Sequence, residues 1–169
     1  TNTTGNANTA VGFDAMIDNS TGSSNTAFGN LALSNNTTAN NNVAIGNAAL
    51  EDNTTGSQNT ALGYDALGDN TTGSANTAVG YEALSTNTGS NNTAVGKYAL
   101  RLNQTGGSNT ALGNNALLQN TTASNNVAVG IGSLSANLTG GNNTAVGGES
   151  LDANTSGAHN VAVGFAALG

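Results

Sequence analysis

Residues Asn70-Thr-Thr-Gly-Ser-Ala-Asn-Thr-Ala-Val-Gly-Tyr-Glu-Ala-Leu-Ser-Thr86 form one copy of a 17-residue unit that fills the chain. Self-similarity at one fixed short period is the signature of a repeat architecture. We number the positions of a unit from 1 to 17, and the units begin at residues 2, 19, 36, 53, 70, 87, 103, 120, 137 and 154. Residues 1–169 are therefore read as a single repeat array.

The most regular part of the unit is the pentapeptide Asn-(Thr/Val)-Ala-(apolar)-Gly at positions 7–11. Its alternation of β-branched and small residues is typical of a short strand, and seventeen residues are too few for a helical hairpin. The pentapeptide begins at Asn8, Asn25, Asn42, Asn59, Asn76, Asn92, Asn109, Asn126, Asn143 and Asn160.

These features predict an all-β fold, a parallel β-solenoid or β-roll of ten coils. A second short strand is expected at positions 12–15, and the Asn-Thr-Thr-Gly of positions 1–4 is a turn signal. Strands of successive coils stack about 4.8 Å apart, so ten coils would span about 48 Å. The sixth unit lacks one residue in Asn87-Thr-Gly-Ser-Asn-Asn92, and a loop accepts such a loss more easily than a strand.

The columns of the repeat suggest a thin core. We expect the apolar residue of position 10 and the Leu or Met of position 15 to point inward, with position 8 half-buried. The Ala of position 9 would then face the other way and line a close contact with another chain. Because a lone coil buries little, we predict a homotrimer, intertwined or side by side.

Besides the Ala of position 9, two residue types are invariant, and both have a structural explanation. Asn stands at positions 1 and 7 of every unit, where stacked amides can form hydrogen-bonded ladders along the array. Gly stands at position 11 of every unit, which indicates a positive φ or a close backbone contact. Position 4 is Gly except at Ala39 and Ala123, so a positive φ is not expected there.

Asn42-Val-Ala-Ile-Gly46 and Asn126-Val-Ala-Val-Gly130 resemble the strand motif of trimeric autotransporter adhesin heads, which are parallel β-rolls wound as trimers. The complete unit also resembles arrays in bacteriophage tail fibres and related bacterial surface fibres. The resemblance covers essentially the whole chain. It implies a trimeric rod, and it leaves function more open than architecture because one rod serves many fibres.

Composition excludes several classes. The chain has 24 Gly, no Cys, 7% charged residues and a net charge of −7. Without Cys there is no disulfide framework and no Cys-ligated zinc. With two basic residues there is no electrostatic footprint for nucleic acid. No apolar run approaches the length that membrane insertion needs.

The sequence offers no catalytic constellation, so we expect no enzyme, no cofactor and no metal site. The single His159 stands at a variable position, and all nine acids lie at variable positions 13, 16 and 17. We read these acids as a solvated face, with calcium binding as the alternative. Nine units begin with Asn-x-Thr/Ser, a glycosylation acceptor motif that the turn chemistry also produces.

Outward aromatic side chains are the candidates for surface contact. Tyr64 and Tyr81 share position 12 in successive units, with Tyr98 beside them, and Phe13 and Phe165 occupy the same position in the first and last units. A cell-surface glycan or a host matrix protein would be the partner. Both end units match the middle ones, so we expect either part of a longer rod or a subunit that stacks end to end.

The leading functional hypothesis is a segment of a structural or adhesive extracellular fibre: a surface adhesin, a filament or a phage tail-fibre rod on a cell or virion surface. Two alternatives stay open. One is an ice-binding solenoid that uses a Thr ladder, and the other is a calcium-dependent extracellular matrix module. The Thr ladder would comprise Thr9, Thr26, Thr60, Thr77, Thr93, Thr110 and Thr144.

Overall fold

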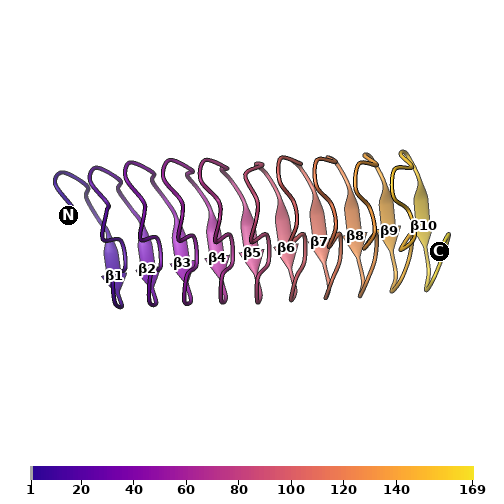
Figure 1. Cartoon of the computed structure of the whole chain (residues 1–169), viewed down its shortest axis with the longest axis horizontal. Helices are drawn as coiled ribbons and strands as arrows, with labels where there is room; N and C mark the ends of the chain where they lie inside the picture. Colours follow the sequence, from indigo (N-terminus) through magenta and orange to yellow (C-terminus); the bar gives the residue numbers. More distant parts are fainter. Residues whose placement is uncertain (1) are drawn as a thin grey trace.

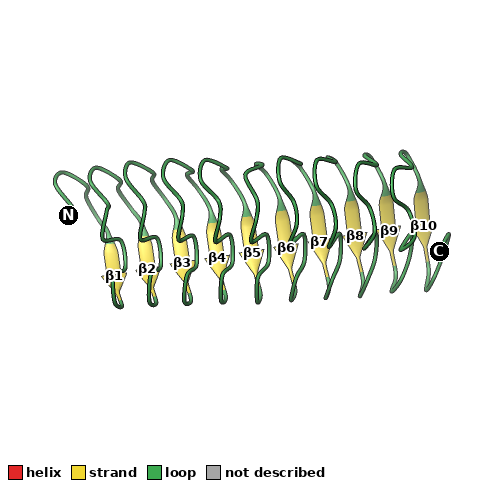
Figure 2. Cartoon of the chain, viewed as in Figure 1, coloured by secondary structure: helices red, strands yellow, loops and turns green. Residues whose placement is uncertain are grey.

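The structure, a computed structural model, describes residues 2–169 and contains strands and turns but no helix within them. Ten three-residue strands lie side by side in chain order, and the rest of each unit loops around to the next strand (Figures 1 and 2). The strands are β1 (Thr9–Val11), β2 (Thr26–Phe28), β3 (Val43–Ile45), β4 (Thr60–Leu62), β5 (Thr77–Val79), β6 (Thr93–Val95), β7 (Thr110–Leu112), β8 (Val127–Val129), β9 (Thr144–Val146) and β10 (Val161–Val163).

Every strand is parallel to its neighbours, and equivalent positions of the repeat face each other. Ala27 pairs with Ala10 on one side and with Ala44 on the other. The missing residue of unit 6 does not disturb this register, since Ala78 still pairs with Ala94. The predicted parallel β-solenoid with 17-residue coils is therefore confirmed.

The two faces of the strand wall are opposite to our expectation. The Ala of position 9 points inward and is fully buried in most units, as at Ala61 and Ala94, whereas the apolar residue of position 10 points outward, as at Leu62. The predicted Ala-lined contact between chains is therefore wrong. The physical reason is space: the coil has room for one large side chain per unit, and the Leu of position 15 fills it.

The core lies between the strand wall and the wall formed by positions 13–17. Ala61 belongs to the same buried cluster as Ala66 and Leu67, which come from positions 14 and 15 of the same unit. The inward direction of position 15 is thus confirmed. The fully buried Leu residues are Leu33, Leu50, Leu67, Leu84, Leu100, Leu117 and Leu134.

Positions 13–17 form consecutive turns, so the second strand predicted at positions 12–15 is wrong. In unit 4, Asp65 and Leu67 have φ of 53° and 54°, in the left-handed region, and the chain cannot extend as a strand. The N–H of Asp65 donates to Asn47 in the preceding unit and that of Leu67 to Ala83 in the following unit, both at 3.0 Å. These turns still stack along the rod by hydrogen bonds.

Both Asn columns are buried and hydrogen-bonded, but the predicted bonding of one side-chain amide to the next occurs only at position 1, whereas the position 7 side chains bond the backbone of the next unit. In the position 1 ladder, Asn53 Nδ2 donates to Asn36 Oδ1 at 3.1 Å and to Gly56 O at 2.9 Å. In the position 7 ladder, Asn59 N donates to Asn42 Oδ1 at 2.9 Å. These amides replace the backbone partners that a turning chain would otherwise lack inside the coil.

Both reasons for an invariant Gly at position 11 apply. From Gly12 to Gly164 the φ of these residues lies between 127° and 147°, which side chains rarely adopt. A Cβ at Gly147 would also overlap the carbonyl oxygen of Gly164 in the next unit.

We expect Asn53→Ala to lower the free energy of unfolding by about 3 kcal/mol, because it leaves buried amide and carbonyl groups without partners. Urea denaturation measures the change. The matched control is Asn47→Ala, which removes an exposed amide that donates to Asn30 Oδ1 at 3.0 Å and should cost less than about 1 kcal/mol. Equal effects of the two variants would contradict a stabilising role for burial of the ladder.

The adjacent pair Gly147 and Gly148 tests the constraint at position 11. Gly147→Ala should lower the melting temperature strongly, with a loss of about 3 kcal/mol, because the new Cβ meets backbone at a strained φ. Gly148→Ala should be nearly neutral, since its Cβ would lie 3.4 Å from the Phe165 ring. Thermal melts of both variants, followed by circular dichroism, decide the matter.

Candidate functional site

The outward face of the ten-stranded sheet carries a continuous column of apolar side chains from position 10. Phe28, Ile45 and Leu62 are 57%, 38% and 44% exposed, and Val79 and Val129 are half-buried. No strand contains a charged residue. The column consists of Val11, Phe28, Ile45, Leu62, Val79, Val95, Leu112, Val129, Val146 and Val163.

A second column runs beside the first on the same face. It consists of the Thr or Val side chains of position 8, which are half-buried in seven units, as expected, and exposed at Thr9, Thr60 and Val161. Thr26, Thr60 and Thr77 belong to it, and Val43 and Val127 interrupt the hydroxyl series. The two columns together make an uncharged strip on a molecule whose net charge is −7.

The sequence analysis did not predict that position 10 is exposed, although the variation in side-chain size at this position indicates it. Position 9 accepts only Ala, whereas position 10 accepts side chains as different in size as Val79, Leu62 and Phe28. A close-packed interior is sensitive to a change of even one methylene group. Tolerance of size therefore indicates the exposed face, and strict identity indicates the core.

The three tyrosines form one cluster in units 4–6. The Tyr64 and Tyr81 rings stack with centroids 5.1 Å apart, and Tyr98 meets Tyr81 edge to face at 5.6 Å. Tyr64 and Tyr81 are exposed and Tyr98 is half-buried. Hydrogen bonding to Glu82 raises the pKa of Tyr81 above its ordinary value. The structure thus brings together three of the five aromatic residues proposed for surface contact.

The other two proposed contact residues lie far from this cluster. Phe13 follows β1 and Phe165 follows β10, at opposite ends of the array (Figure 1). Both are exposed, at 71% and 77%. Three unit steps separate Phe13 from Tyr64 and four separate Phe165 from Tyr98, so neither Phe joins the contacts between the tyrosine rings.

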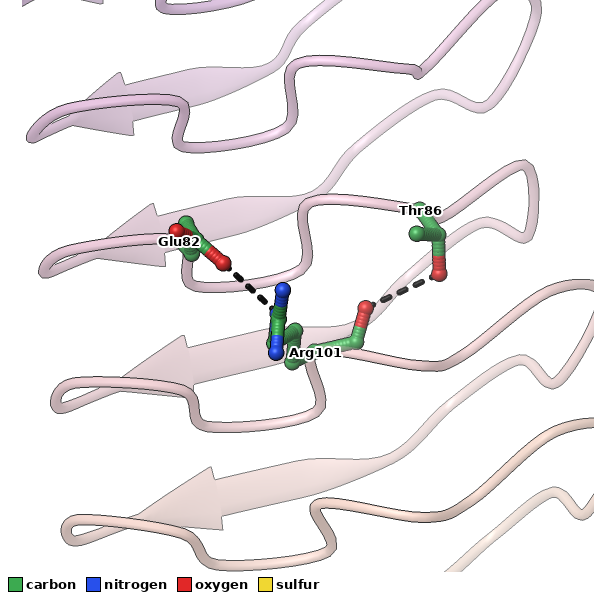
Figure 3. A network of polar contacts seen from close by, with 3 residues as sticks. All are labelled: Glu82, Thr86 and Arg101. Atoms are coloured by element: carbon green, nitrogen blue, oxygen red, sulfur yellow. Dashed lines mark hydrogen bonds and ion pairs between the residues drawn. The ribbon is translucent and has the colours of Figure 1, made fainter.

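Both basic residues of the chain join the tyrosine cluster. Lys97 Nζ lies 4.7 Å from the centre of the Tyr98 ring and 5.7 Å from that of Tyr81. Arg101 Nε lies 2.6 Å from Glu82 Oε2, and this is the one ion pair within residues 2–169 (Figure 3). The Glu82 carboxylate belongs to unit 5, and both cations, Lys97 and Arg101, belong to unit 6.

The Asn-x-Thr/Ser motifs place their acceptor Asn in the interior of the rod. Asn36, Asn53 and Asn120 are fully buried, and each donates Nδ2 hydrogen bonds to its own unit and to the preceding one. A glycan on the Nδ2 atom of a position 1 Asn would replace one of the two N–H donors and would need space that a fully buried side chain does not have. The folded rod therefore excludes glycans from these buried acceptors.

Acidic side chains gather near units 3 and 4 on the turn wall. Burial, and then the charge of neighbouring acids, raises the pKa of Glu51 and of Asp69. Burial also raises the pKa of Asp65, against a hydrogen bond from Ser85 that lowers it. Within residues 2–169 no three His, Cys, Asp or Glu side chains come together as a metal-binding group would require.

The described surface is flat rather than hollowed. Residues 2–169 form no pocket, and the exposed His159 has a φ of 60° in the loop before β10. In this part of the chain no helix is long and apolar enough to cross a membrane. The features that remain for recognition are the apolar strip and the cluster of tyrosines and cations.

Comparison with known proteins adds no relative. No protein family matches the chain, and no curated protein or solved structure matches it.

The raised carboxyl pKa values predict that the fold tolerates acid. Each of these groups binds its proton more readily in the folded than in the unfolded chain, so stability rises as pH falls through the raised pKa. We expect a melting temperature at pH 4 at least equal to that at pH 7. A melting temperature that falls steadily over this range would contradict the assignment.

Asp69→Asn should raise the melting temperature at pH 7 and flatten its dependence on pH. The change removes the repulsion between Asp69 and Asp52 that helps to raise the Asp69 pKa. An amide at this position can also bond as Asn35 does, whose Nδ2 donates to Asp52 Oδ1 at 2.8 Å. Asp152→Asn, in an acid of unit 9 far from Asp52 and Asp69, is the control.

Proposed function

We propose that the chain is a rod segment of a structural and adhesive extracellular fibre that assembles as a homotrimer through its apolar strip. The observation that supports this most directly is the uncharged strip along all ten strands. Soluble monomers rarely expose a contiguous apolar patch of this kind, and larger ones mark sites of association. A second copy of the chain carries the same strip at the same spacing.

The size of the strip is adequate for specific association. Ten strands at about 4.8 Å and three residues at about 3.3 Å give a face of roughly 500 Å² on each chain. Two such faces bury on the order of 1,000 Å², the lower limit of a specific interface. Each unit adds only a small buried area, so the affinity between chains increases with the number of units.

Charge also favours the strip as the contact face. The acids at positions 13, 16 and 17 lie on the turn wall, so chains that meet through their strands keep these charges apart and in water. The resemblance to trimeric adhesin heads supports three copies around one axis. The buried Ala column has no part in this contact.

Adhesion would use the side chains that remain outward in the assembled rod. Tyr64, Tyr81 and Tyr98 are the candidates, with a cell-surface glycan or a matrix protein as the partner. Three copies of the cluster would act together, and repetition raises apparent affinity without any deep pocket. We propose no enzymatic activity, no nucleic-acid partner and no membrane insertion.

Ice binding is the second candidate, and one observation favours it. The Thr side chains of position 8 lie on the outward face of a regular parallel sheet, with Thr60 and Thr77 in register in successive strands. Large side chains of unequal size at position 10, such as Phe28, disturb the flatness of this face.

The mass of the particle in solution tests the proposal. We expect a mass near three times 16.4 kDa by light scattering after size exclusion. Val95→Asp with Leu112→Asp should give a monomer, because carboxylates in the buried centre of an apolar interface are costly. Gln119→Asp introduces a single carboxylate at an exposed site on the turn wall and should leave the trimer intact.

A stable 16.4 kDa monomer would overturn the trimer and the fibre contact together. Thermal hysteresis in such a monomer would establish the ice-binding alternative, and its loss in Thr60→Leu with Thr77→Leu would assign it to the Thr column. A mass of two chains would keep the strip as the contact and reject threefold assembly.

A further inference from the structure

Unit 6 lacks the residue of position 3, and the loss interrupts the position 1 ladder. Asn70 Nδ2 donates to Asn53 Oδ1 at 2.9 Å, and Asn103 Nδ2 donates to Asn87 Oδ1 at 2.6 Å. Between these bonds, Asn87 Nδ2 turns to Gly89 O at 2.8 Å. Asn70 Oδ1 is left buried with no hydrogen-bond partner.

The backbone ladder at the same corner is interrupted as well. At every other step between units 1 and 10, the position 2 N–H donates to the position 2 carbonyl of the next unit, as Thr54 does to Thr71 at 3.0 Å and Thr88 to Gln104 at 2.7 Å. The N–H of Thr71 has no such acceptor in unit 6. The bonds that Thr54 Oγ1 and Thr55 N donate to Thr71 O also have no counterpart one step on, so units 5 and 6 meet with four fewer hydrogen bonds at this corner than units 4 and 5.

The same two units are held together at the far end of the turn wall. Arg101 of unit 6 pairs with Glu82 of unit 5, whose side chain is 14% exposed. Thr86 Oγ1 donates to Arg101 O at 2.9 Å, so Arg101 receives two contacts from unit 5 (Figure 3). The edge-to-face contact of Tyr98 with Tyr81 joins the same units. We name Glu82, Thr86, Arg101, Tyr81 and Tyr98 the clamp.

We propose that the contact between units 5 and 6 is a hinge, which opens at the Asn70 corner and stays joined at the clamp. In a repeat array each unit contacts only its neighbours, so local opening occurs first at the weakest step. Opening gives water access to Asn70 Oδ1, which is buried without a partner, whereas the clamp, whose Glu82 side chain is 14% exposed, keeps its contacts. The rod can therefore bend between units 5 and 6, whereas its other units are joined uniformly. This property goes beyond the proposed role in assembly.

The contacts within the cluster of tyrosines and cations are consistent with a role in holding units 5 and 6 together. Its rings contact one another, Lys97 lies over Tyr98, and Arg101 is neutralised by Glu82. Both cations of the chain and the missing residue fall in the same unit.

Hydrogen exchange of strand amides tests the hinge. The N–H of Thr77 donates to Asn92 O and crosses the proposed opening, whereas that of Thr60 donates to Asn76 O one step away. Both bonds are 2.8 Å, so their geometry alone predicts equal protection. We expect Thr77 to exchange about tenfold faster than Thr60, since one buried group without a partner weakens the step. Equal rates would overturn the proposal.

Two variants separate the corner from the clamp. Insertion of one Thr between Thr88 and Gly89 restores the Asn-Thr-Thr-Gly turn and should slow exchange at Thr77 to the rate of Thr60. Glu82→Gln removes the ion pair and should speed exchange at Thr77 about threefold. Glu149→Gln, at the same position of unit 9, is the matched control and should leave Thr77 unchanged. No change in Thr77 exchange in either the insertion or Glu82→Gln would overturn the hinge, whatever the oligomeric state.

Discussion

The rod depends on two buried amides in each unit. A chain that closes a coil in seventeen residues must turn its backbone repeatedly, and its inward carbonyl and N–H groups cannot all find strand partners. The Asn of position 1 and the Asn of position 7 supply the missing partners, and both direct Nδ2 to a position 4 carbonyl, as Asn42 and Asn53 do at Gly56. Neither side chain can shorten or lose its amide without leaving a buried polar group alone, which explains why neither column varies.

The buried Asn side chains of positions 1 and 7 also limit the space that is left for apolar side chains inside the coil. Asn side chains occupy one end of the coil cross-section, and the remaining space between the strand wall and the turn wall admits one Leu and two small residues per unit. Ala61, Ala66 and Leu67 show this allotment in unit 4. A core of this size buries little apolar area for seventeen ordered residues, so much of the stabilisation must come from hydrogen bonds between units. The larger apolar side chains of position 10 are displaced to the outside, where they become available for association.

The sequence predicted the architecture because the period of the repeat, the location of the strand, and the Asn and Gly columns each have a single physical explanation. It did not predict which face of the strand is buried. Alternation with a period of two places positions 9 and 10 on opposite faces but does not say which of them faces the core. Nor did it predict the turns of positions 13–17, since Leu residues such as Leu67 adopt a positive φ that their type disfavours. The cluster of Tyr64, Tyr81 and Tyr98 could be foreseen, because Tyr64 and Tyr81 share position 12 and Tyr98 stands at the neighbouring position 13. The Glu82–Arg101 pair required the turn geometry.

In an array of this kind, uniform columns and exceptional residues carry different information. A column such as position 9 reports on a constraint that every unit shares, and it says nothing of a local site. The cations, the tyrosine cluster and the missing residue break the pattern, and they do so in adjacent units that contact one another. A deletion that weakens one corner of a step and side chains that strengthen its far end are energetically coupled, because both act on the same contact between units 5 and 6. The irregular residues of the chain are therefore best interpreted as one local adaptation of the rod rather than as independent substitutions.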